Sequence, residues 1–247
     1  MLSKKHLFLL YLLLLPVPGF ASDAIPGFFD VDYTLYSNDT KIGEMERRFF
    51  QHEDGNFAFV SQRRTTGLIS VFRNEKILEE SHWRYTETGY RPIRYIYQHT
   101  SRKKNRDVEI DFDWPNKRIT NRVNDSTWKM KTQPGILDKL LYQLAIMTSL
   151  KSGVVPESYT IADGGKIKQY LFEHLDDEVI KTPLGDFKTM KLARHKPGSD
   201  QDTFLWCAYD LQYLPVKVSI TEKEGRLTTA VIKDLNGLGY SPKAQSN

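Results

Sequence analysis

The sequence predicts a mainly β protein, in which a large antiparallel sheet curls into an open barrel and one amphipathic helix plugs the concave face. Apolar and polar residues alternate along many short runs, and turns rich in Gly, Asn and Asp separate most of them. After the N-terminus, helical spacing of apolar residues is found at 134–153. A sheet of many strands tends to curl, which removes exposed edges and gives such a helix an apolar partner.

The predicted strands begin with an antiparallel meander. Phe29, Val31 and Tyr33 share one face of the first strand, Ser37 to Thr40 forms a turn, and a second strand returns to Gln51. Residues 65–72 either extend the third strand or begin the next. The other strands are predicted at 57–61, 75–85, 91–99, 108–114, 119–123, 158–161, 168–174, 178–192 (two strands around a Pro-Gly turn), 202–209, 214–221 and 226–235.

The helix is predicted between Pro134 and Gly153. Pro134-Gly135 ends the preceding strand, and Asp138 places a negative charge near the positive end of the helix dipole. The apolar face carries Leu137, Leu140, Leu141, Leu144 and Thr148. A lone helix with such a face, flanked by strands on both sides, is expected to lie inside the curve of the sheet.

Residues 1–21 have the pattern of a secretory signal peptide. Lys4 and Lys5 form a basic head, residues 7–15 are apolar, and a helix-breaking stretch ends at Ala21. An uncleaved membrane anchor would need about 20 apolar residues, more than this run provides. No cysteine follows the run, so no lipid anchor is expected. We therefore expect a signal peptide at 1–21, one β domain at 22–240, a flexible tail at 241–247 and a periplasmic location with no membrane span after cleavage.

Charge and cysteine content narrow the function classes. Without Lys4 and Lys5 the chain keeps 33 basic and 31 acidic residues, which is not typical of nucleic-acid binding. Cys207 has no partner for an intramolecular disulfide and is expected to be a small buried hydrophobe rather than a reactive thiol. The basic loop from Arg102 to Arg106 is either a solvated hairpin tip or a contact for phosphate or acidic head groups.

No motif of nucleophilic catalysis is present, and the histidines lack metal-ligand spacing, so we expect no catalytic residue, metal or cofactor. Asp111 and Asp113 share one face of a predicted strand, and a pair of carboxylates is what glycoside hydrolysis requires. The same alternation is typical of a solvent-facing strand surface.

Aromatic side chains occur in predicted strands along the whole chain. They either fill a packed core or line an apolar pocket, since a curled sheet of this size can enclose one. For the second case, the candidate ligand-binding residues are Tyr33, Phe59, Trp83, Tyr95, Trp114, Leu140, Leu144 and Trp206.

Two stretches, Thr182 to Thr189 and Trp206 to Val216, resemble an exported bacterial family known as domain of unknown function 3108. The resemblance covers about Tyr33 to Ile220. Further landmarks occur in the family's order, namely Asp32-Tyr33, Gly43-Glu44, Gly67-Leu68, Arg91-Pro92, Phe112-Asp113-Trp114, Leu137-Asp138 and Ala162-Asp163-Gly164. The chain departs from the family at Cys207, where an aliphatic residue is expected, and at Leu141, where serine is expected. The resemblance implies no activity and no catalytic residue. At the level of fold it is similar to curled-sheet envelope proteins that carry or sense lipoproteins.

These observations favour a soluble periplasmic protein that binds an apolar ligand, such as a lipid or lipoprotein acyl chain, or an envelope partner, without covalent chemistry. Two alternatives remain open. One is an envelope glycan hydrolase that uses Asp111 and Asp113. The other is a structural or regulatory module that pairs with a partner strand at a sheet edge near Tyr33 or Val231.

Overall fold

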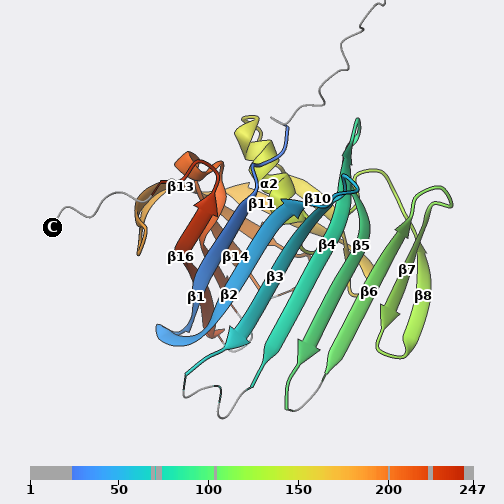
Figure 1. Cartoon of the computed structure of the whole chain (residues 1–247), viewed down its shortest axis with the longest axis horizontal. Coiled ribbons are helices and arrows are strands. Elements are labelled where there is room, and N and C mark those ends of the chain that lie inside the picture. Colours follow the sequence, from blue (N-terminus) through green and yellow to red (C-terminus); the bar gives the residue numbers. More distant parts are fainter. Residues whose placement is uncertain are drawn as a thin grey trace, which may run out of the picture.

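One sheet contains all sixteen described strands, in the order β8-β7-β6-β5-β4-β3-β2-β1-β16-β15-β14-β13-β11-β10-β9, with β12 paired to β13 (Figure 1). The computed structural model describes residues 24–67, 70, 74–102, 105–199, 201–221 and 225–241. The predicted signal peptide, most of the predicted tail, part of the region 65–72 and part of the basic loop lie outside these residues. The mainly β fold with one curled, unclosed sheet is confirmed.

The elements have the following bounds: β1 Phe29–Ser37, β2 Thr40–Gln51, β3 Phe57–Thr65, β4 Lys76–Thr86, β5 Gly89–Thr100, β6 Arg106–Asp113, β7 Arg118–Val123, β8 Ser126–Lys131, β9 Leu137–Asp138, α2 Tyr142–Lys151, β10 Ser158–Asp163, β11 Lys166–His174, β12 Glu178–Thr182, β13 Gly185–His195, β14 Thr203–Ala208, η1 Tyr209–Leu211, β15 Leu214–Thr221 and β16 Leu227–Gly237.

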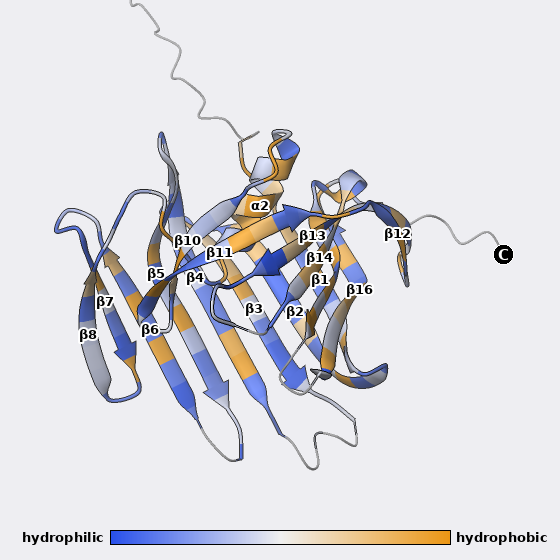
Figure 2. Cartoon of the chain, turned by 180° about the vertical axis from the view of Figure 1, so that it is seen from behind, coloured by the Kyte–Doolittle hydropathy of each residue, from blue (hydrophilic) through white to orange (hydrophobic). Residues whose placement is uncertain are grey.

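The sheet folds back on itself, so that β1–β8 form one layer and β9–β16 the other (Figure 1). The layers are continuous through the antiparallel pair of β1 and β16, in which Tyr33 lies opposite Ile232. Hydrophobic and hydrophilic residues alternate along the strands in Figure 2, as one face toward the core and one toward solvent requires. The inward residues of both layers form a single core with the helix.

Two strands differ from the sequence expectation. β8, at one end of the sheet, has no counterpart among the predicted ranges. β9 lies inside the predicted helix, where Leu137 and Asp138 pair in parallel with Ile161 and Ala162 of β10. The prediction that the helix begins at Pro134 is therefore wrong, and α2 begins at Tyr142.

The buried carboxylate of Asp138 explains this later start. Its Oδ1 accepts hydrogen bonds from the amides of Leu140 and Leu141 at 2.9 and 2.8 Å, and its Oδ2 accepts one from Ser81 Oγ of β4 at 2.6 Å. The side chain satisfies amides that the first helical turn would leave unpaired, while the backbone of Asp138 stays in a strand. Burial raises the pKa of Asp138 to about 6, although these hydrogen bonds act to lower it.

Both layers enclose the helix. Toward the first layer, the Tyr90 hydroxyl of β5 donates to the Leu144 carbonyl and shares a hydrogen bond with Thr148 Oγ1, at 3.2 and 2.6 Å. Toward the second, the Tyr142 hydroxyl accepts a hydrogen bond from Arg194 of β13 at 2.8 Å. Leu140 and Leu144 are 1% and 0% exposed. The helix therefore plugs the concave face, as the sequence predicts.

A tryptophan ties the free end of the first layer to the second. The indole Nε1 of Trp128, on β8, donates to the carbonyl of Gly165 in the β10–β11 turn at 2.9 Å. Gly165 has a φ of +86°, and a Cβ there would lie 1.7 Å from the Trp128 ring. A glycine is therefore required at this turn, because any side chain would collide with the indole.

A free sheet edge near Tyr33 or Val231 would favour the strand-addition hypothesis, but both residues lie in strands that are paired on both sides. Tyr33 lies in β1, which pairs with β2 and β16, and Val231 lies in β16, which pairs with β1 and β15. The sheet order ends at β8 and at β9, and β8 carries the exposed lysines Lys129 and Lys131. Lysines at a terminal strand discourage pairing with another chain.

We expect Tyr90→Phe to lower the free energy of unfolding by about 1 kcal/mol, because it removes the hydroxyl that bonds the helix to β5. Urea unfolding followed by circular dichroism measures this loss. Tyr85→Phe is the matched control, since the Tyr85 ring contacts Tyr90 and is 37% exposed. Equal losses in both variants would contradict the assigned role of the Tyr90 hydroxyl.

We also expect Asp138 to make stability fall as pH rises. The folded-state pKa of about 6 exceeds the ordinary value of 3.8, so the unfolded chain loses this proton at lower pH than the folded protein does. The cost of ionising Asp138 accumulates between about pH 4 and pH 6 and reaches at most about 3 kcal/mol. Asp138→Asn cannot titrate. The unfolding free energy of wild type minus that of Asp138→Asn should therefore decrease across this window, and a difference independent of pH would contradict the assignment.

Candidate functional site

The structure does not bring the eight predicted ligand-binding residues together around one pocket. Trp114 directly follows β6, and its indole donates to the Pro92 carbonyl of β5 at 2.7 Å. Trp206 faces outward and donates to Glu178 Oε2 at 2.9 Å. The other six are packed in the core and at most 2% exposed, namely Tyr33, Phe59, Trp83, Tyr95, Leu140 and Leu144. Their role in ligand binding remains a prediction.

The concave face carries instead a group of charged side chains between the two layers, which we call the charged belt. Its cations and carboxylates influence one another electrostatically and come from seven strands or the residues that follow them. The members are Arg47, Arg63, Glu79, Asp138, Lys139, Asp163, Lys168, Arg194 and Lys196. Six are cations and three are carboxylates, so the belt has a surplus of positive charge.

One half of the charged belt centres on Glu79. The Tyr95 hydroxyl donates to Glu79 Oε2 at 2.8 Å, and the Lys139 ammonium lies 5.0 Å from the centre of the Tyr97 ring. Burial acts to raise the pKa of Glu79, but Lys139, Arg63 and the Tyr95 hydrogen bond hold it below its usual value. This carboxylate is therefore ionised and already neutralises part of the nearby positive charge.

The other half centres on the Tyr170 ring of β11. Arg194 Cζ lies 4.8 Å and Lys196 Nζ 4.7 Å from its centre. Asp163 Oδ2 accepts hydrogen bonds from Lys168 Nζ at 2.7 Å and from the Tyr170 hydroxyl at 3.0 Å. Burial and the nearby Arg194 lower the pKa of Lys196 to about 8. The positive charge of Lys196 is thus costly in the absence of a further anion.

Next to the charged belt the concave face is only partly covered. Leu35 of β1 and Val218 and Ile220 of β15 point inward but are half-buried, and we call these three residues the lower patch. Neighbouring inward positions closer to the helix, such as Tyr33 and Val216, are fully buried. Solvent therefore reaches the concave face at the end away from α2.

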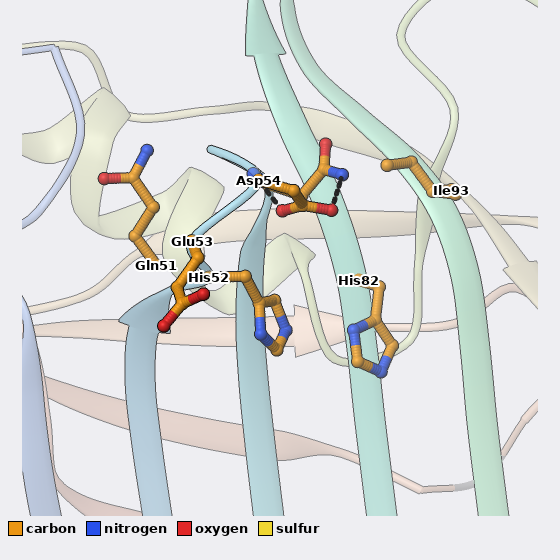
Figure 3. Close-up of a pocket in the computed structure, with 7 residues that line it drawn as sticks. Gln51, His52, Glu53, Asp54, His82 and Ile93 are labelled. Atoms are coloured by element: carbon orange, nitrogen blue, oxygen red, sulfur yellow. Dashed lines mark hydrogen bonds between the residues drawn. The ribbon is translucent and has the colours of Figure 1, made fainter.

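Outside the curve, one depression holds about 660 Å³ (Figure 3). His52 and His82 stack there with ring centres 5.7 Å apart, and Asp54 accepts two hydrogen bonds from Asn56. A second depression of about 500 Å³ lies against the outward face of β15 and β16 and includes Lys181 and Lys217. Among the described residues, no group of His, Cys, Asp and Glu side chains has a metal-binding arrangement.

Asp111 and Asp113 lie on the outward face of β6, in surface ion pairs. Asp111 Oδ2 contacts Arg122 Nη1 at 2.5 Å, and Asp113 Oδ2 contacts Arg118 Nη2 at 2.8 Å. Hydrogen bonds from Asn116, with help from Arg118, hold the pKa of Asp113 below its usual value. A general acid for glycoside hydrolysis needs a raised pKa, so this geometry does not support the hydrolase hypothesis.

Cys207 is fully buried on β14, and burial raises the pKa of its thiol to about 12. The thiol is therefore almost entirely protonated at neutral pH, as expected for a small core residue. Within the described part of the chain, no helix is long and apolar enough to span a bilayer.

Among solved structures, the chain is similar to a β-barrel-like protein with domain of unknown function 1849 from Brucella abortus. The TM-score is 0.54 at 7% identity, over 87% of this chain and 100% of the other. The Pseudomonas aeruginosa MucA/MucB complex matches with a TM-score of 0.18 at 9% identity, over 85% and 89% of the two chains. The first likeness shows a shared fold.

No curated protein is similar enough in sequence to match this chain. The family model described as "protein of unknown function (DUF3108)" matches residues 29–231, which include every member of the charged belt and the lower patch. The chain therefore belongs to the DUF3108 family.

Proposed function

We propose that this protein is a binding protein of the bacterial cell envelope, and that its ligand is an amphiphile whose apolar chain lies on the lower patch. The observation that carries the proposal is the uneven cover of the concave face. Near α2 the inward residues of the concave face are buried in the core. Leu35, Val218 and Ile220 are only half-buried and lie beside charged groups. Apolar side chains that stay accessible inside a curved sheet are typical of a surface that a ligand covers.

The register places the lower patch on adjoining strands. Leu35 lies opposite Ala230 of β16, and Ala230 lies opposite Val218 of β15, so the three side chains share one row. Ile220 is two residues further along β15 and points to the same face. Neighbouring strands are about 4.8 Å apart, so the patch is wide enough for one acyl chain to lie across it.

The envelope location rests on the sequence of residues 1–21, which has the basic head, apolar run and small-residue end of a secretory signal peptide. An exported binding protein of this kind would meet lipids, detached acyl chains and lipoproteins. The terminal strand β8, with its two exposed lysines, gives less support to a partner that binds by strand addition.

A neutral probe tests the proposal without involving charge. We expect the fluorescence of phenylnaphthylamine to rise saturably on binding to the full protein after signal removal, and dodecanol to displace the probe. Val218→Gln should weaken dodecanol binding about fivefold, because about 1 kcal/mol of apolar contact is lost.

Val231→Gln is the matched control, since Val231 is half-buried on the outward face of the neighbouring strand. It should leave dodecanol affinity unchanged. Ile220→Gln serves as a second patch variant if Val218→Gln fails to fold by circular dichroism. Absence of saturable binding, or equal losses for patch and outward variants, would overturn the proposal.

A further inference from the structure

Around the Tyr170 ring, the cations of the charged belt outnumber the carboxylates. Two cations, Arg194 and Lys196, contact this ring, and Lys139 and Lys168 are near enough to lower the pKa of Lys196 further. Asp163 is the carboxylate of the belt near this ring, and it already forms an ion pair with Lys168 at 2.7 Å. Among the residues that the structure describes, neither Arg194 nor Lys196 forms an ion pair with a carboxylate. A cation withdrawn from water is costly unless an anion accompanies it.

Two arginines of the charged belt each have a nitrogen without a hydrogen-bond partner. Arg194 is 8% exposed, and two of its nitrogens are bonded, one to the Tyr142 hydroxyl and one to Thr203 Oγ1. Its Nε is buried without a hydrogen-bond partner, as is Nε of Arg47 across the belt. Buried polar atoms are rarely left unpaired, and a buried arginine is normally matched to a carboxylate or phosphate.

The cations adjoin the lower patch through the sheet register. Arg194 lies opposite Thr203 of β14, and Thr203 lies opposite Ile220 of β15. Arg194 and Ile220 are therefore two strands apart on the same inward row, a separation of about 10 Å. An apolar chain on the lower patch would thus place its head group at the charged belt.

From this geometry we infer that Arg194 and Lys196 bind the anionic head group, a carboxylate or a phosphate, of the amphiphile whose chain covers the lower patch. The inference rests on the proposed function and narrows it from any apolar chain to an acidic one. Arg194 supplies a fixed, nearly buried guanidinium held by Tyr142 and Thr203. Lys196 is half-buried, directly follows β13 and supplies a second positive charge. Such an anion would offset the surplus of cations over carboxylates in the belt.

Lys196 is the residue to change, because Arg194 is part of the core and its loss would leave Tyr142 and Thr203 without their donor. We expect dodecanoate and dodecyl phosphate to bind the full protein at least about tenfold more tightly than dodecanol, in displacement of phenylnaphthylamine. Lys196→Gln should weaken binding of dodecanoate and dodecyl phosphate about tenfold and leave dodecanol affinity unchanged. Lys196→Arg should retain most of the affinity for these two acidic probes. Lys188→Gln, an exposed lysine of β13 beside Tyr209, is the matched control and should behave as wild type.

The outcomes separate the two proposals. If dodecanol binds but the acidic probes bind no tighter, or if Lys196→Gln weakens all three probes equally, the anionic site is wrong while the apolar site stands. If dodecanol does not bind, the proposed function fails first. Inorganic phosphate that displaces dodecyl phosphate from wild type but not from Lys196→Gln would support the anionic site and identify phosphate as sufficient for it. A preference for dodecyl phosphate over dodecanoate, or the reverse, distinguishes the two head groups.

Discussion

The fold depends on the need to bury one short helix on nearly all sides. In α2 the buried residues are Tyr142, Leu144, Ala145, Ile146, Met147 and Leu150, which leaves little of the helix for solvent. A single flat sheet covers only one side of a helix, so the sheet must fold around it. Tyr90 holds the helix from the first layer and Arg194 holds it from the second. The curved sheet thus supplies the cover that this helix requires.

The charged belt lies where this helix stops filling the curve. On the helix side the two layers share a continuous apolar core, and beyond it the inward positions include Glu79, Asp163 and several cations. Inside a folded protein such groups need partners; Asp163 pairs with Lys168, and Glu79 accepts a hydrogen bond from Tyr95. Arg194 connects the two regions, since it bonds the helix through Tyr142 and contacts the Tyr170 ring of the belt. The residue that positions the helix is therefore also one that carries a buried nitrogen, Nε, without a hydrogen-bond partner.

Most of the fold could be predicted from the sequence because strand alternation is a local signal. The first residue of the helix could not be predicted, since Leu137 and Asp138 fit the spacing of a helix as well as that of a strand. Their strand partner, β10, lies more than twenty residues later, and the capping bonds of Asp138 are invisible to a periodicity argument. β8 is short and mostly polar, and its Trp128 finds its partner in a distant turn. The charged belt could not be predicted, because its members are scattered over seven strand regions and share a face only through sheet register. The same register packs most of the predicted aromatic site residues into the core.

The tie between Trp128 and Gly165 has a mechanical consequence. A closed barrel has a girth fixed by the stagger of its hydrogen-bonded strands, so any widening must break a ladder. In this sheet, the end of the first layer at β8 contacts the second layer through the indole of Trp128, which packs directly on the backbone of Gly165. A rotation of the Trp128 ring about its χ angles would break this hydrogen bond, whereas every strand pair could stay intact.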